Sequence, residues 1–161
     1  MKISLFLFCL LCPLLLYAAV DEDDYQKIDY TQIRHIHGAL LKKSTAGTGH
    51  NLAATTHKYR LTVKFSRDIR KLSPANRKVL QDWGETLRVR EDFLAQYQRE
   101  FKVALNGETL WIPLREPMVN DMGNELHTDN AFELFVLLIG AIDQRFVFLA
   151  TDFKSSRSLE Q

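Results

Sequence analysis

Histidines are the first residues in this sequence that could do chemistry, because an imidazole can bind a metal ion or move a proton. His35 and His37 are two residues apart, so both could reach one metal ion only in an extended chain. In a helix their side chains would diverge by about 200°. His50, His57 and His127 are scattered along the chain. A structural zinc site normally needs four converging ligands, so we expect no metal site and no cofactor.

Nucleophilic catalysis has no recognisable motif here. The sequence contains no Gly-x-Ser-x-Gly and no Ser-x-x-Lys, and the glycines of residues 46–49 lack the Lys-Ser/Thr ending of a phosphate-binding loop. Four carboxylates of the last third could in principle pair as a general acid and base: Glu116, Asp121, Glu125 and Asp129. Nothing in the spacing shows that two of them share a cleft. We therefore assign no catalytic residue and keep a small hydrolase as one alternative.

A basic row beside an aromatic ring is the only binding signal in the sequence. Lys58, Arg60 and Lys64 would project from the solvent side of one strand. Trp111 is out of phase with the apolar residues around it, so it should point away from their core. Barrels hold polyanions or stacked rings with such residues. These four are our predicted ligand-binding residues, although such lysines can equally protect a strand edge and the tryptophan can lie beneath a helix.

The elements that would position these residues follow from apolar periodicity. Strict alternation predicts a strand over 58–66, and Ser73-Pro74 starts a helix that Gly84 should end. Asn106-Gly107 predicts a two-residue hairpin turn within 97–114. Pro113 cannot donate to a ladder, so the second hairpin strand should end there or lie at an edge.

The ends of the chain complete this pattern. Acidic residues, apolar residues at helical spacing and two terminal lysines predict a helix over 21–43, and small polar residues predict a loop over 44–57. A short helix follows over 117–126. Strands over 132–139 and 145–150 are apolar on both faces. If the predicted helices do not cover them, Phe135, Leu137, Phe146 and Phe148 would form an exposed apolar patch.

This order of elements favours an α+β fold. We expect a small five-stranded antiparallel sheet with two or three helices, curled toward a partly closed OB-like barrel. The helix between the first two strands departs from the OB plan. A small antiparallel sheet with helices packed on one face is the alternative.

The first twenty residues resemble a secretory signal. Lys2 precedes an apolar run to Tyr17, and Ala18-Ala19 come before an acidic cluster. An uncleaved anchor helix is the alternative, because the run is just long enough to span a bilayer. We divide the chain into a signal peptide (1–19), an N-terminal helix and flexible loop (20–57), one globular β-rich domain (58–153) and a polar tail (154–161).

Charge and composition restrict the function further. Lys2 is the only charged residue before Asp21, so the rest of the chain carries 20 basic and 20 acidic side chains. This balance gives no general attraction to nucleic acid or to an anionic membrane. Both cysteines lie within residues 1–19, and the chain has no Asn-x-Ser/Thr acceptor, which favours a bacterial envelope.

We therefore expect an exported, non-catalytic binding module of the periplasm or the extracellular space. A protein or an envelope component is the expected partner. A polyanion- or oligosaccharide-binding barrel is a second hypothesis, and the carboxylate hydrolase is a third. No membrane span is expected once the signal is removed, and the oligomeric state stays open.

Overall fold

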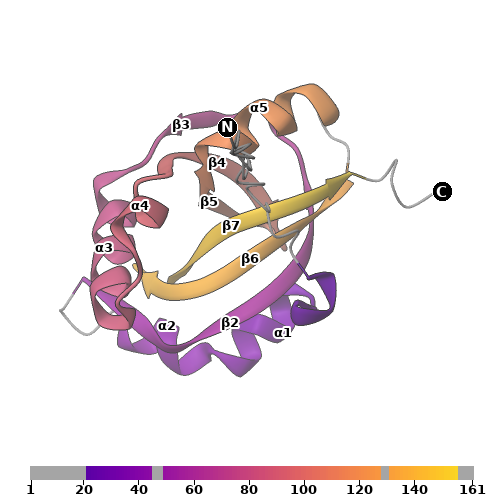
Figure 1. Ribbon diagram of the computed structural model, residues 1–161. Coiled ribbons are helices and arrows are strands. Elements are labelled where there is room, and N and C mark those ends of the chain that lie inside the picture. The colour runs from indigo at the N-terminus through magenta and orange to yellow at the C-terminus, as the bar shows by residue number, and fades with distance from the viewer. Residues whose placement is uncertain (1–20, 45–48, 128–130, 156–161) are drawn as a thin grey trace, which may run out of the picture.

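The chain forms one curled sheet covered by helices (Figure 1). The structure, a computed structural model, describes residues 21–44, 49–127 and 131–155. Within these ranges it contains seven strands in one open, mixed sheet and five α-helices. The predicted five-stranded antiparallel sheet with two or three helices, and with it the OB-like barrel, is therefore wrong. The predicted signal peptide (1–19) lies outside the described residues.

Two strands were missed because they are too short to show a period. The strands are β1 (Gln26–Lys27), β2 (His50–Lys64), β3 (Ile69–Lys71), β4 (Tyr97–Leu105), β5 (Glu108–Arg115), β6 (Ala131–Ile142) and β7 (Arg145–Ser155). Their order across the sheet is β1-β2-β6-β7-β5-β4-β3. The pairs β1–β2 and β5–β7 are parallel and the others antiparallel. The two short strands therefore form the two edges of the sheet.

Helices cover both faces of the sheet. They are α1 (Tyr30–Ile36), α2 (Gly38–Lys43), α3 (Pro74–Leu87), α4 (Glu91–Leu94) and α5 (Glu116–Glu125). Side chains of α1, α2 and α5 join the larger apolar cluster on one face, and those of α3 and α4 join the smaller cluster on the other. Phe135, Leu137, Phe146 and Phe148 are all buried between them. The apolar patch considered from the sequence is therefore covered, and this explains why β6 and β7 are apolar on both sides.

Local signals in the middle of the chain are confirmed. Asn106 and Gly107 both have positive φ, 49° and 80°, as a tight hairpin turn requires. The hydroxyl of Ser73 accepts a hydrogen bond from the Asn76 amide at 3.3 Å, which caps the start of α3. The predicted strands at 132–139 and 145–150 lie within β6 and β7, and the predicted strand at 58–66 overlaps β2 up to Lys64, where β2 ends.

The N-terminal segment differs from its prediction. One helix over 21–43 is replaced by a 3₁₀ turn (Glu22–Asp24), β1, and the helices α1 and α2, which meet at His37. The expected loop over 44–57 is strand from His50 onward. A bulge hides the period there, because Leu52 pairs with Gly140 and His57 already pairs with Leu138. Of the predicted polar tail, Lys154 and Ser155 belong to β7.

Two stop signals were also misread. Helix α3 passes Gly84 and ends at Leu87, where Arg88 caps it with a φ of 54°. A Cβ at Gly84 would lie 2.4 Å from the Leu94 side chain. The glycine therefore leaves room for α4 to pack against α3, and it does not end the helix. Pro113 lies inside the sheet, since β5 runs between β4 and β7. From the hairpin turn onward, hydrogen-bonded pairs of β4 and β5 alternate with pairs that are not hydrogen-bonded, so the Pro113 nitrogen points away from β4. On its other side, β5 pairs with β7 only at Leu114–Ala150.

None of the helices among the described residues is long and apolar enough to cross a bilayer.

Candidate functional site

The predicted basic row on β2 is largely neutralised by carboxylates. Lys58 Nζ lies 2.8 Å from Asp24 Oδ2. Arg60 Nη1 lies 3.4 Å from Glu22 and 3.8 Å from the buried Glu133. Lys64 is exposed and makes no ion pair with any described residue. Two of the three predicted cations are therefore already paired within the molecule.

These pairs belong to a larger cluster at the β1 edge, which we call the N-terminal ion-pair network. Lys27 Nζ binds Glu133 Oε1 at 2.7 Å, and Lys154 Nζ binds Glu22 at 2.9 Å. The network contains Glu22, Asp24, Lys27, Lys58, Arg60, Glu133 and Lys154. It joins the segment after residue 20 to β2, β6 and β7. These ion pairs therefore hold the N-terminal segment against the three strands.

Trp111 does not lie beside that row. It points away from the larger apolar cluster, as predicted, but β6 and β7 lie between its strand and β2. The Arg70 guanidinium covers its ring at 3.7 Å from the centroid. Trp111 and Arg70 line a small hollow of about 210 Å³ in front of the start of α3. The structure thus does not bring the four predicted ligand-binding residues together.

A buried carboxylate organises the start of α3. Glu100 on β4 is fully buried, and Arg70 Nε donates to it at 2.6 Å. Asn76 Nδ2 donates at 2.7 Å and the Ser73 hydroxyl at 3.2 Å. A buried charge is tolerated only with such partners. Glu100 therefore fixes β3 and the first turn of α3 against β4.

An apolar hollow of about 330 Å³ lies between α3, α4 and β4. Its wall contains Leu72, Leu80, Leu94 and Tyr97. The Tyr97 hydroxyl donates to the Ala150 carbonyl at 3.3 Å, and burial raises its pKa far above the usual range, so it stays neutral.

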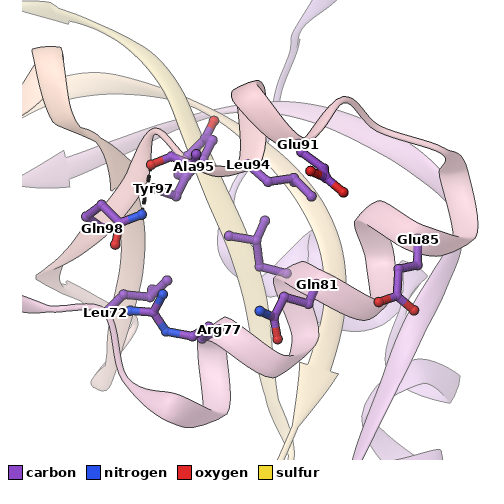
Figure 2. A pocket seen from close by; sticks show the side chains of 10 residues that line it. Leu72, Arg77, Gln81, Glu85, Glu91, Leu94, Ala95, Tyr97 and Gln98 are labelled. Atoms are coloured by element: carbon purple, nitrogen blue, oxygen red, sulfur yellow. Dashed lines mark hydrogen bonds between the residues drawn. The ribbon is translucent and has the colours of Figure 1, made fainter.

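The rim of the hollow is polar. Figure 2 shows Arg77, Gln81 and Glu85 on successive turns of α3, with Gln98 and Glu91 on other parts of the rim. The side-chain amide of Gln98 donates a hydrogen bond to the Ala95 carbonyl at 2.8 Å, which fixes the position of this side chain. One end of the rim is therefore basic, at Arg77, and the other acidic, at Glu85 and Glu91.

A second hollow of about 610 Å³ continues from the basic end and shares Arg77 and Gln98 with the first. It runs along β3 and is lined by Ile69, Arg70, Lys71, Arg77, Gln98, Arg99 and Glu116. We call the two hollows together the β3 groove.

Two cations of the β3 groove have no counterion. Arg70 is paired with Glu100, and Arg99 Nε lies 3.4 Å from Glu116. Lys71 and Arg77 are exposed and form no ion pair with any residue of the described ranges. The groove thus combines an apolar hollow with two free positive charges.

The edge of β3 also presents free backbone groups. Leu72 N donates to Gln98 O at 2.9 Å and Lys102 N donates to Asp68 O at 3.0 Å, so even-numbered residues face β4. By alternation, the amides and carbonyls of Ile69 and Lys71 point away from the sheet. An unpaired strand edge of this kind can accept another strand.

Catalytic groups are not assembled in the described part of the chain. Glu116, Asp121 and Glu125 are exposed on α5, and Asp129 lies outside the described residues. Glu85 and Glu91 do line one hollow, but both are exposed at its rim. No group of three or more His, Cys, Asp or Glu residues in the described ranges could hold a metal ion.

The sequence missed the β3 groove and one histidine contact. Lys71 and Arg77 lie on different elements, and only the folded structure brings them to one hollow. His37 and His57 come together although twenty residues separate them, with ring centroids 4.5 Å apart. No pattern in the sequence indicates either arrangement.

No family model, no curated protein and no solved structure matches the chain. The geometry of the β3 groove is therefore the main support for a function.

Proposed function

We propose that this chain is an exported, non-catalytic interaction module whose β3 groove binds an extended, acidic segment of a partner protein. The observation that carries the proposal is the free edge of β3 beside the unpaired Lys71 and Arg77. Export rests on the signal-like pattern of residues 1–19.

The free edge favours an extended partner. A peptide that adds to a strand edge gains main-chain hydrogen bonds, and alternate side chains then enter neighbouring pockets. Ile69 and Lys71 supply the outward amides and carbonyls, and the apolar hollow beside Leu72 and Leu94 supplies a pocket. Hydrogen bonds would give affinity and the hollow would give specificity.

The charges favour an acidic segment with a defined polarity. Carboxylates of the partner would lie at Lys71 and Arg77, because Glu116, the acid that lines the same hollow, is paired with Arg99. Glu85 and Glu91 at the other end would repel them. A segment with acidic residues at one end and an apolar residue after them fits this pattern.

Other functions have less support from the geometry. A polyanion on Lys58, Arg60, Lys64 and Trp111 would have to compete with Glu22, Asp24 and Glu133 for two of the cations. A carboxylate hydrolase would need one acid kept protonated in a protected site, whereas Glu85 and Glu91 are exposed.

A labelled peptide tests the proposal. The probe is an eight-residue peptide with acidic residues in its first half and an apolar residue after them, titrated into the purified protein and followed by fluorescence anisotropy. A charged hydrogen bond contributes about 1.5–3 kcal/mol, and exposure reduces this, so Lys71→Ala/Arg77→Ala should weaken binding by about tenfold or more. Lys58→Ala/Lys64→Ala is the matched control and should bind like the parent.

Three results would overturn the proposal: no binding of the acidic peptide, equal binding by the two double variants, or equal binding of a peptide with lysines in place of its acids. Single-stranded DNA and a sulfated glycan are tested in parallel. Tighter binding of either polymer, with loss in Lys58→Ala/Lys64→Ala, would favour the polyanion hypothesis instead.

A further inference from the structure

His37 and His57 form a histidine pair on the face of the sheet covered by α1 and α2. Their ring centroids lie 4.5 Å apart with the ring planes tilted by 54°. His37 is the residue at which α1 ends and α2 begins, and His57 lies on β2. Both rings are partly buried.

The chain has specific features that bring the two rings together. The break between α1 and α2 places His37 over β2, where its ring also contacts Tyr59 and Phe146. The bulge after Leu52 re-aims the strand just before His57. Bulges that redirect a side chain are common beside functional sites.

Each imidazole has one nitrogen held by a hydroxyl. His37 Nε2 lies 2.6 Å from Tyr59 Oη, and His57 Nε2 lies 3.0 Å from Thr55 Oγ1. No described residue bonds to either Nδ1 atom. Metal-bound histidines usually have their second nitrogen in such a hydrogen bond, which fixes the orientation of the ring.

We propose that His37 and His57 form a two-imidazole site for a divalent transition-metal ion, with Cu²⁺ preferred over Zn²⁺. Imidazole ligands suit both ions, and Cu²⁺ binds more tightly at a given site. The described residues contain no cluster of three or more metal-binding side chains, so water completes the coordination. Such an open site exchanges its metal and is independent of the β3 groove.

Metal titration of the tag-free protein tests the site. Cu²⁺ and Zn²⁺ are titrated separately at pH 7.5 by calorimetry, with His37→Ala, His57→Ala and, as matched control, His35→Ala. We expect one bound Cu²⁺ per chain, weaker Zn²⁺ binding, loss in the first two variants and no change in the third. Binding should weaken as the pH falls to 5.5, because protons compete for the rings.

A spectroscopic readout keeps the test valid if a variant fails to fold. Electron paramagnetic resonance of Cu²⁺ bound to the parent protein should show hyperfine splitting from two imidazole nitrogens. Absence of Cu²⁺ binding, a signal without two nitrogens, or binding that survives in both folded His37→Ala and His57→Ala would overturn the proposal.

Discussion

The two edges of the sheet use basic residues in opposite ways. At the β1 edge, Lys58 and Arg60 are paired with Asp24 and Glu22, carboxylates 34 and 38 residues away in the sequence. At the β3 edge, Lys71 and Arg77 have no such partner among the described residues. Each edge contains one buried glutamate, Glu133 or Glu100. Acids from remote segments of the chain therefore decide whether a row of cations is paired within the molecule or is free to bind a partner.

The largest expected effect comes from the two buried glutamates. Glu100→Gln places an amide NH₂ among three donors, so the free energy of unfolding should fall by about 2 kcal/mol. Glu133→Gln should cost about 1 kcal/mol, because its partner Lys27 is 63% exposed and such pairs are weak. Urea denaturation measures both.

Binding of the acidic peptide should also distinguish Glu100→Gln from Glu133→Gln. Glu100→Gln loosens the start of α3, which carries Arg77, so it should also weaken binding of the acidic peptide severalfold, while Glu133→Gln should not. A greater loss of stability in Glu133→Gln would reverse the proposed roles of the two glutamates.

Removing the cations of each edge gives a smaller effect on stability. Lys58→Ala/Arg60→Ala breaks ion pairs to Asp24, Glu22 and Glu133, and we expect a loss of about 1 kcal/mol. Lys71→Ala/Arg77→Ala breaks none and should change the free energy of unfolding by less than about 0.5 kcal/mol. Equal losses in thermal or urea denaturation would contradict the distinction between the edges.

We expect the smallest effect from a variant that removes the acids of the β1 edge and so leaves its cations unpaired, as at the β3 edge. Glu22→Gln/Asp24→Asn removes the exposed acids beside Lys58 and Arg60, and the freed cations should increase retention on a sulfated matrix at low salt. The retention should disappear near physiological salt. Glu85→Gln/Glu91→Gln is the control with the same change in net charge, and equal retention would show a general charge effect.

Local signals in the sequence predicted individual turns, caps and strands, but not the seven-stranded mixed sheet. The Asn106-Gly107 turn, the Ser73 cap and the alternation in 58–66 depend on neighbouring residues, so they can be read from the chain. The sheet edges and the parallel pairs depend on tertiary contacts. Gly84 illustrates the limit, because its role is set by Leu94 ten residues later.

The candidate site was less accessible from the sequence. The basic row at Lys58 and Arg60 has the clearer pattern, yet its acids come from the N-terminal segment and β6. The β3 groove has no pattern in the sequence, because Lys71, Arg77 and the apolar wall come from β3, α3, α4 and β4. Trp111 was oriented correctly, but its distance from β2 depends on strand order, which alternation cannot show.

Amide hydrogen exchange at β3, measured by NMR with and without the acidic peptide, tests the strand-addition claim most directly. We predict that the amides of Ile69 and Lys71 become protected when the peptide binds, since they point away from β4 in the free protein. The amides of β1 should not change. Unchanged exchange at Ile69 and Lys71, with the peptide bound elsewhere, would contradict the assignment of the β3 groove.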